Sequence, residues 1–282
     1  MRKQPIYILT EDLNFFYVLK KELDKHNIKF QILNLDAKIP TISSIILTTS
    51  EDFDKLKVGP HNTYLVYSKN HDFEKYLIKV IAAYRIKYKE NYSTLTFSID
   101  PGKRLGLMIF LDDFYLESYC CLEKNVLLKF INKHIETFQD DNPSLIDINF
   151  KLGRGVLTIA FDLVKEIYSL FHDRNNLKVH LIDEFRSSKI RLSREKGYRK
   201  ISKDEISALI LAFRNGITVD QDNYEYIFEQ IKNKSLKTDD FNTLKTNNHE
   251  DYLLDLKEVI EKVLNGEINL SSAMEMLSNN KT

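Results

Sequence analysis

The order of predicted strands and helices between residues 95 and 216 restricts the fold more than any other feature of this sequence. Three strands follow one another directly, and the chain then alternates helix, strand, helix, strand and helix up to Gly216. The predicted strands are Leu95–Asp100, Leu107–Leu111, Phe114–Cys121, Leu145–Phe150 and Val179–Ile182, and the predicted helices are Val126–Phe138, Val156–Phe171 and Glu205–Phe213. Asp112 and Asp113 are expected at the turn between the second and third strands. This order predicts an α/β domain with a mixed sheet.

The first ninety residues predict a smaller, Rossmann-like α/β domain with a mainly parallel sheet. Its predicted strands are Ile6–Leu9, Lys29–Asn34, Ser44–Thr48 and Thr63–Tyr67, and its predicted helices are Leu13–His26 and Phe73–Lys87. No glycine-rich loop follows these strands, which argues against dinucleotide binding. Glu11 and Asp12 follow the first strand, where they fit either a phosphate-receiver pocket or the acidic first turn that any helix favours.

Composition changes after residue 217, where acidic side chains outnumber basic ones. Ser235–Glu250 is polar enough for a flexible connector, and Tyr252–Leu264 and Leu270–Leu277 predict two short amphipathic helices. A helical pair of this size cannot bury its own apolar face, so we expect it to dock elsewhere. The predicted domain limits are therefore 1–90, 91–217 and 218–282.

Several general features limit the cellular setting. No run of residues is long and apolar enough to span a membrane, and the N-terminal segment turns acidic before a signal-peptide core can form, so we expect a cytoplasmic protein. Cys120 and Cys121 are neighbours in a predicted strand, where a disulfide between them would be strained, and we expect reduced thiols in the core. The formal net charge is zero, so only local clusters can indicate a nucleic-acid partner.

The candidate chemistry begins at Asp100, where the first predicted strand of the second domain ends. The chain then turns through glycine and re-enters a strand, which leaves room for a cation and a phosphate beside the carboxylate. The residues Asp100, Gly102, Lys103, Arg104 and Gly106 resemble the opening motif of the RuvC and YqgF families, the YqgF form in particular. The resemblance covers less than half of the chain. It implies a ribonuclease-H-like domain, preceded by the Rossmann-like domain and followed by the C-terminal helices, with Asp100 as a metal ligand. An ordinary hairpin with a turn aspartate is the structural alternative.

Three further acidic positions fit this resemblance. Asp147 lies within the fourth predicted strand, at the place where RuvC-type enzymes carry a catalytic glutamate, and a charge inside a buried strand needs a reason. Asp183 and Glu184 end the fifth strand and resemble the Asp-Glu-Arg signature of YqgF proteins, although Phe185 interrupts it. The alternatives are a partly solvated strand edge for Asp147 and a structural ion pair for the other two.

The start of the last predicted helix supplies two more acids. Ser202 and Glu205 have the spacing of a capping box, which gives Glu205 a structural role. Asp204 lacks such a role, and in RuvC-type enzymes the corresponding helix start carries one or two aspartates. Asp204 matches the first of these, whereas Ser207 replaces the second, so Glu205 is kept as a substitute ligand. The predicted catalytic residues are thus Asp100, Asp147 and Asp204, and the predicted metal ligands add Glu205, Asp183 and Glu184.

Basic side chains gather next to these acids. A basic segment leads from the fifth strand into the last helix, and further basic residues follow the first and fourth strands. The predicted nucleic-acid contacts are Lys103, Arg104, Lys151, Arg154, Arg186, Lys189, Arg191, Arg194 and Arg199. Such a run is usually a solvated surface, but cations beside metal-binding acids suit an enzyme that cuts a polyanion.

These features together predict a divalent-metal-dependent nuclease that uses Mg²⁺ or Mn²⁺ and acts on structured nucleic acid. Resemblance to RuvC implies a DNA junction as substrate, and resemblance to YqgF implies structured RNA. The alternative is a catalytically weak or inactive nucleic-acid-binding scaffold, in which the N-terminal domain or the C-terminal helices bind a protein partner or a second copy of the chain. Actin-like ATPases share the first-strand motif, but they need a second copy of the domain, which the sequence does not show.

Overall fold

A computed structural model describes residues 4–139, 142, 146–184, 201–233 and 249–279, including side chains except those of residues 249–254 and 279. These residues form two compact units, one up to Glu90 and one from Asn91 onward. Each unit is α/β, as the sequence predicts, and each is described separately below. None of the helices in the described ranges is long and apolar enough to cross a membrane.

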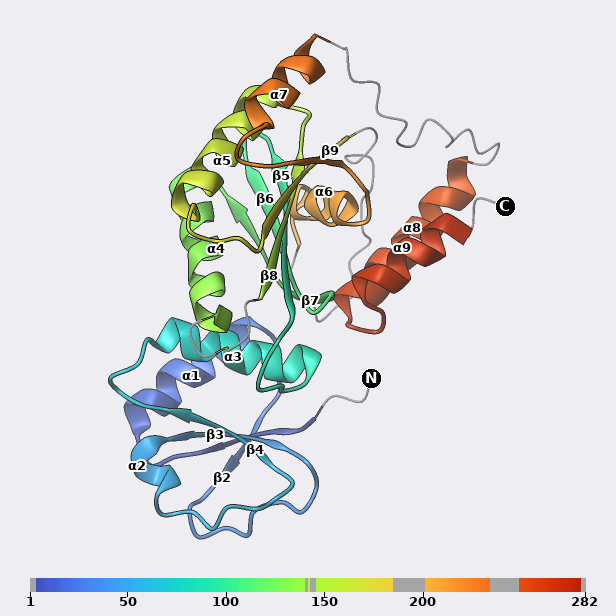
Figure 1. Cartoon of the computed structure of the whole chain (residues 1–282). Coiled ribbons are helices and arrows are strands. Elements are labelled where there is room, and N and C mark those ends of the chain that lie inside the picture. The colour runs from blue at the N-terminus through green and yellow to red at the C-terminus, as the bar shows by residue number, and fades with distance from the viewer. Residues whose placement is uncertain (1–3, 140–141, 143–145, 185–200, 234–248, 280–282) are drawn as a thin grey trace. The chain divides into compact units, whose positions relative to one another are not determined.

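The first unit is a four-stranded parallel sheet with the strand order β2-β1-β3-β4 (Figure 1). Its elements are β1 (Ile6–Leu9), α1 (Leu13–Lys25), β2 (Gln31–Leu33), β3 (Ile45–Thr49), α2 (Ser50–Phe53), β4 (Thr63–Tyr67) and α3 (Phe73–Ile86). Asp12 and Asp72 cap the two long helices by accepting hydrogen bonds from backbone amides of the first turn. Phe15 of α1 stacks on Tyr67 and meets Tyr76 of α3 edge-on, so aromatic rings join these helices. The predicted parallel sheet is confirmed, and only the short α2 was not expected.

The second unit is a six-stranded mixed sheet with the strand order β10-β9-β8-β5-β6-β7. Its elements are β5 (Thr94–Pro101), β6 (Leu105–Leu111), β7 (Phe114–Cys121), α4 (Lys124–Gln139), β8 (Asp147–Gly153), α5 (Leu157–Leu170), β9 (Leu177–Ile182), α6 (Lys203–Ala212), β10 (Ile217–Val219), α7 (Tyr224–Lys232), α8 (His249–Leu264) and α9 (Leu270–Asn279). Strands β5, β6 and β7 form an antiparallel meander, whereas β8 and β9 continue the sheet in parallel. Asp112 and Asp113 have φ of 47° and 66°, which is the backbone of a tight primed hairpin turn at the predicted position.

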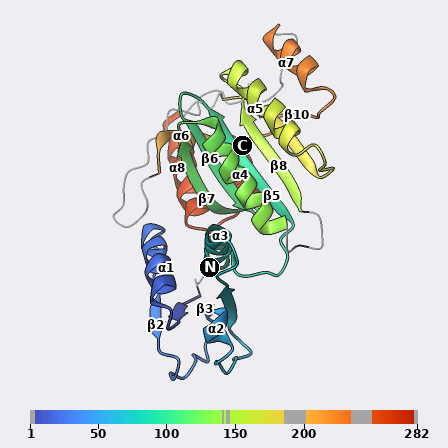
Figure 2. The ribbon, with the colours of Figure 1, turned by 90° about the vertical axis from the view of Figure 1, so that its left-hand side faces the viewer.

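The helices of this unit cover both faces of the sheet (Figure 2). Helices α4 and α5 lie on one face, and α6 lies on the other. Two elements were not predicted, the three-residue β10 and helix α7. They are held by tertiary contacts, because the Tyr168 hydroxyl of α5 donates to the carbonyl of Val219 and Phe228 of α7 meets Phe161 edge-on.

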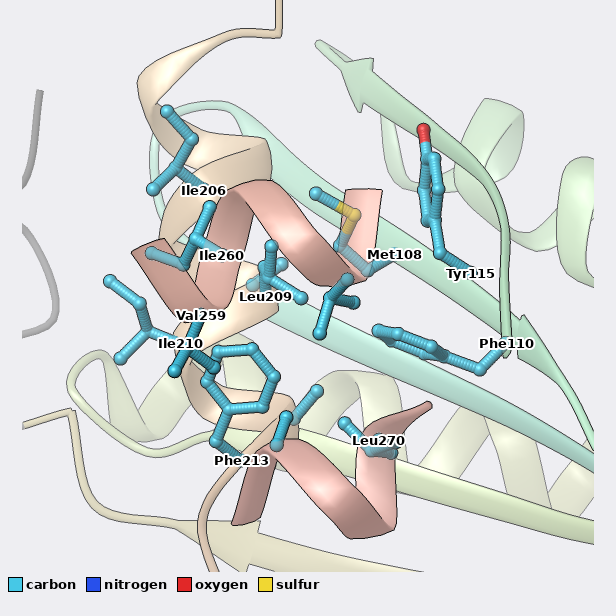
Figure 3. Packing of buried hydrophobic residues seen from close by; sticks show 14 of the residues in the cluster. Met108, Phe110, Tyr115, Ile206, Leu209, Ile210, Phe213, Val259, Ile260 and Leu270 are labelled. Carbon is cyan, nitrogen blue, oxygen red and sulfur yellow. The ribbon is translucent and has the colours of Figure 1, made fainter. Parts of the chain in front are cut away.

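The C-terminal helices dock on the face that carries α6, which agrees with the expectation that they cannot stand alone (Figure 3). Val259, Ile260 and Leu270 pack with Leu209 of α6 and with Phe213 at its C-cap in one buried cluster. The start of α9 is also fixed to the β6–β7 turn, because the Leu270 amide donates to the carbonyl of Asp113. Helix α6 is therefore enclosed between the sheet and α8–α9, and little of it faces solvent beyond its first turn.

Candidate carboxylate site

Helix α6 begins directly above the strand end that carries Asp100. Asp100 pairs with Gly106 across β5 and β6, and Gly106 pairs with Cys120 across β6 and β7. A side chain at Gly106 would overlap the carbonyl group of Asp204, the second residue of α6. The glycine thus lets the helix start rest on the sheet, and this close approach brings Asp204 beside Asp100.

The sequence-predicted capping box fixes this helix start. The Ser202 hydroxyl accepts a hydrogen bond from the Glu205 amide at 3.2 Å, and the Glu205 carboxylate accepts one from the Ser202 amide at 2.8 Å. Glu205 is buried, with 2% of its surface exposed. Its carboxylate therefore has the structural role, and its use as a substitute metal ligand is not supported.

Asp100 is surrounded by groups that oppose its charge. Burial raises the pKa of Asp100 to about 7, and the charges of Glu184 and Asp204 act in the same direction. A hydrogen bond from Ser207 opposes this effect. Ser207 stands where the resemblance expects a second helix aspartate, and its small side chain lets α6 lie close to the strand.

Glu184 follows the end of β9, and its charge acts on Asp100. Its carboxylate accepts a hydrogen bond from the Gly155 amide at 2.8 Å. Burial raises the pKa of Glu184 as well, although the Gly155 hydrogen bond works in the opposite direction. Three predicted ligands, namely Asp100, Glu184 and Asp204, are thus near enough for their charges to interact, and they come from β5, the end of β9 and the start of α6.

Asp147 does not belong to this site, and the prediction that it converges with Asp100 is wrong. It is the first residue of β8, it is exposed, and it pairs with Thr94 at the start of β5. Six residues of parallel strand separate Thr94 from Asp100, which is about 20 Å at 3.3 Å per residue. The prediction failed because β8 extends further toward the C-terminus than expected, so that Gly153 follows the residue that pairs with Ile99.

Two predicted phosphate-binding residues have structural partners instead. Lys151 donates to the carbonyls of Ala212 and Arg214 at 2.6 and 3.0 Å, so it caps the C-terminal end of α6. Arg154 pairs with Asp183 at 3.2 Å, and only 12% of its side chain is exposed. Asp183 thus forms a structural ion pair, the alternative to a metal-ligand role that the sequence left open. Of the two acids, Glu184 is the one whose charge acts on Asp100.

The remaining basic candidates divide into two groups. Lys103 and Arg104 lie in the turn between β5 and β6 and are exposed, immediately after Asp100. The residues Arg186, Lys189, Arg191, Arg194 and Arg199 lie outside the described residues. The predicted phosphate surface is therefore described only at the β5–β6 turn.

Cys120 is a neighbour of the site that sequence reasoning missed. It is exposed, in contrast to the expected core position, whereas Cys121 is buried. Its thiol lies 3.6 Å from the Asp204 carboxylate. The sequence could have indicated this, because neighbouring residues in a strand point to opposite faces of the sheet, so only one of the two cysteines can lie in the core on a given face.

The carboxylates do not form a preformed metal cage. Within the ranges that the structure describes, no three His, Cys, Asp or Glu side chains are close enough to hold one metal ion. Asp100, Glu184 and Asp204 are instead coupled by charge. Hard oxygen donors that repel one another suit a divalent cation that keeps part of its water shell, as Mg²⁺ does when one or two carboxylates bind it.

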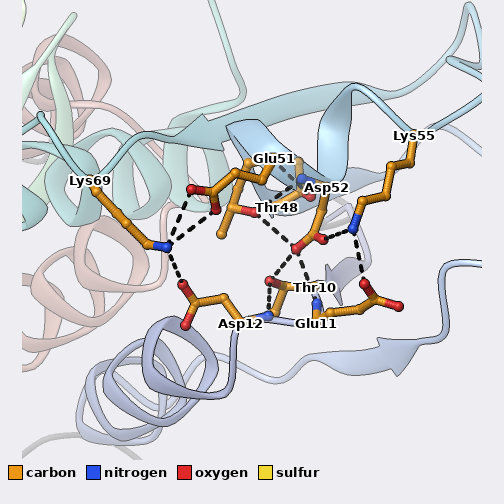
Figure 4. A network of polar contacts seen from close by, with 9 residues as sticks. Thr10, Glu11, Asp12, Thr48, Glu51, Asp52, Lys55 and Lys69 are labelled. Carbon is orange, nitrogen blue, oxygen red and sulfur yellow. Dashed lines mark hydrogen bonds and ion pairs between the residues drawn. The ribbon is translucent and has the colours of Figure 1, made fainter.

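The first unit contains a second polar cluster, at the carboxyl ends of its strands (Figure 4). Lys69 bridges Asp12 and Glu51, and Lys55 bridges Glu11 and Asp52. Burial alone would raise the pKa of Asp52. Hydrogen bonds from its partners, chiefly the Thr10 and Thr49 hydroxyls, outweigh burial, so the pKa of Asp52 is lowered. Asp12 caps α1, which agrees with the second interpretation of Glu11 and Asp12, in which acids favour the start of a helix. These contacts describe a structural clamp, and they give no support to a phosphate-receiver pocket.

Comparisons with known proteins assign no family to this chain. No family model matches the sequence, and no curated protein matches it. A structure of the large terminase from a thermophilic bacteriophage aligns over 84% of this chain and 87% of the terminase chain, with 9% sequence identity and a TM-score of 0.19. A likeness at that score is too weak to support an assignment of fold or function.

Proposed function

We propose that the second unit is a divalent-metal-dependent nuclease that hydrolyses phosphodiester bonds in structured nucleic acid. The observation that carries this proposal is that α6 rests on Gly106, the β6 partner of Asp100, which brings Asp204 to the end of β5. Burial there, together with the charges of Glu184 and Asp204, raises the pKa of Asp100 to about 7. Carboxylates that destabilise one another in this way are stabilised by a bound cation. The cluster lies at the strand end where the resemblance to RuvC and YqgF proteins expects a metal ligand.

The topology supports a ribonuclease-H-like fold for this unit. An antiparallel meander of three strands, extended by parallel strands beside the first, has the element order that such a fold requires. Helix α6 then crosses the opposite face from α4 and α5 and delivers its first turn to the end of β5. Fold alone does not establish activity, so the proposal rests on the carboxylates.

The chain's own residues would divide the work as follows. Asp100 and Asp204 would hold Mg²⁺ or Mn²⁺, Glu184 would add negative charge from the third side, and Lys103 and Arg104 would attract substrate phosphates. When bound, such cations supply an activated water and stabilise the leaving oxygen. Both branched DNA and structured RNA present the phosphates that this arrangement suits.

The second candidate is a nucleic-acid-binding scaffold without strong catalytic activity. The observation in its favour is the absence, among the described side chains, of three acids placed to share one ion. Asp183 pairs with Arg154, which removes one predicted ligand and one predicted phosphate contact together. In this alternative the first unit or the α8–α9 pair would bind protein partners.

The test is a cleavage assay with the full chain on branched DNA and structured RNA, with Mn²⁺ or with a chelator. We expect Mn²⁺-dependent cleavage that Asp100→Asn reduces by at least about 100-fold, because one oxygen ligand and its charge are lost. Asp147→Asn is the matched control, since it removes a carboxylate from the same sheet at the opposite end of the strands. Undiminished cleavage by Asp100→Asn contradicts the site. Metal-independent binding without cleavage by the wild type supports the scaffold.

A further inference from the structure

Gly153 and Gly155, at and just after the end of β8, are not required to be glycine by their backbone conformation. Among the described glycines, only Gly266 has a positive φ, so Gly153 and Gly155 adopt backbone conformations open to other residues. What they lack is space. A side chain at Gly153 would overlap the Glu184 carboxylate and crowd Leu211 at 2.9 Å, and one at Gly155 would overlap the same carboxylate.

The segment around these glycines is also bound to the end of β9 by hydrogen bonds. The Arg154 amide donates to the carbonyl of Ile182 at 3.0 Å, and the Gly155 amide donates to the Glu184 carboxylate at 2.8 Å. The Arg154 side chain pairs with Asp183, and Arg214 donates to the backbone carbonyl of Asp183 at 2.6 Å. These contacts hold the segment from Gly153 to Gly155 beside Asp183 and Glu184. The Glu184 carboxylate fits the space that the two glycines leave.

We propose that Gly153 and Gly155 form a cradle that positions the Glu184 carboxylate toward Asp100, as positioning residues for the acidic site. The proposal rests on the proposed function for its metal-binding consequence. Leu152 of β8 pairs with Ile99, so the next residue, Gly153, lies in register with Asp100. The resemblance places its β8 acid at Asp147, which lies at the other end of the strand. The acid comes instead from the end of the next strand, and the missing side chain of Gly153 is what admits it. The cradle keeps the Glu184 carboxylate hydrogen-bonded to the Gly155 amide and packed against Gly153, the residue after the Ile99–Leu152 pair of β5 and β8.

The first measurement is Mn²⁺ affinity, by calorimetry on the full chain. Gly155→Ala displaces the carboxylate, and we expect 10- to 100-fold weaker Mn²⁺ binding, the usual loss when a residue that orients a ligand is changed. Asp147→Asn is the control, because its carboxylate is exposed and lies at the opposite end of the strands from Asp100. We expect that control to bind Mn²⁺ within about twofold of the wild type.

The rescue variant separates positioning from general damage. Glu184→Asp shortens the side chain by one methylene and retracts the carboxylate from the added methyl group. The double variant Gly155→Ala, Glu184→Asp should therefore bind Mn²⁺ within about threefold of Glu184→Asp alone, which is a coupling between neighbours. A folded Gly155→Ala protein with wild-type affinity overturns the cradle. So does a double variant in which the two losses simply add.

A second measurement decides the cradle without metal. The Gly155 amide should exchange about tenfold or more faster in Glu184→Ala than in the wild type, because it loses a charged acceptor, whereas Glu184→Gln keeps an oxygen there and should retain most of the protection. A Gly155 amide that exchanges at the same rate in Glu184→Ala as in the wild type overturns the cradle. A wild-type chain that binds no Mn²⁺ but shows this dependence retains the cradle and overturns the proposed metal-dependent function.

Discussion

At the scale of single residues, the second unit keeps charged groups where burial works against their charge. Asp100 is the clearest acid of this kind, and Lys151 is the corresponding base. Asp100 lies among other acids, whereas Lys151 donates to backbone carbonyls at the end of α6. The two cases give opposite pH dependences of folding stability.

Replacing Asp100 by asparagine should stabilise the metal-free protein. The pKa of Asp100 is about 7 in the folded chain against 3.8 as its ordinary value, so the folded chain binds more protons between these values and loses stability as pH rises through them. Without metal, we expect Asp100→Asn to be more stable than the wild type at pH 8 by on the order of 1–2 kcal/mol, since solvent screens part of the full linkage value. The difference should largely vanish near pH 4.

Urea unfolding with chelator at pH 4 and pH 8 measures this difference. Asp147→Asn serves again as the control, because its carboxylate is exposed and remote from the cluster. An Asp100→Asn variant less stable than the wild type at pH 8 would show that the carboxylate makes a net favourable contribution to folding.

Lys151 should make the wild type gain stability in alkaline solution. Burial lowers the pKa of Lys151 to about 8 from 10.5, so the unfolded chain binds more protons between these values and stability rises with pH across that window. Neutral lysine keeps two N–H donors for its two carbonyl partners. Lys151→Met should lack this rise, which unfolding of both proteins at pH 7, 8.5 and 10 measures. Parallel stability curves for the two proteins would contradict the lowered pKa.

At the scale of elements, helix α6 is the part that assembles the site. It is buried between the sheet and α8–α9, and its first turn rests on Gly106. Ser98 of β5 donates to the carbonyl of Ala208 at 2.7 Å, and Lys151 of β8 binds the far end of the helix. The helix is thus fixed at its start, middle and end, so Asp204 keeps its place relative to Asp100.

Gly106→Ala should therefore disturb both stability and the site. The added methyl group overlaps the carbonyl of Asp204, so α6 must move away from β6, and overpacking of this kind costs about 1–3 kcal/mol. Cleavage or Mn²⁺ binding should fall together with stability. Gly102→Ala, in the same hairpin, should keep the unfolding free energy close to that of the wild type, because its added methyl group only reaches ordinary contact with the Arg104 carbonyl oxygen at 3.4 Å. Equal unfolding free energies for Gly106→Ala and the wild type would contradict the close approach of helix and strand.

At the scale of the whole molecule, the chain has two compact units. The first is held at its strand ends by the clamp around Asp52, whose carboxylate accepts from Thr10, Thr49 and the Glu11 amide and pairs with Lys55. The second is held by the sheet, by α6 and by the α8–α9 pair.

Asp52→Ala should therefore destabilise the first unit selectively. It leaves two threonine hydroxyls and the Glu11 amide without this acceptor and removes one of two carboxylates bound by Lys55, which we expect to cost about 2–3 kcal/mol. Hydrogen exchange followed by mass spectrometry should show faster exchange in β1 and β3, with β5 to β9 unchanged. Asp54→Ala, an exposed neighbour just past α2, is the control. Equal acceleration in both units would mean that the two cores unfold as one.

The sequence by itself determined most elements, because apolar periodicity, caps and turn residues act over a few positions. It placed β1, β4 and β7 at their observed bounds, the Asp112–Asp113 turn, the capping box of α6 and the docking of the C-terminal helices. It also named Asp100, Glu184 and Asp204. Only the tertiary structure decided which acids meet, because this depends on strand register and on space between distant segments. The register of β8 against β5 places Asp147 about 20 Å from Asp100 along the sheet. The Glu184 carboxylate occupies the space that Gly153 and Gly155 leave.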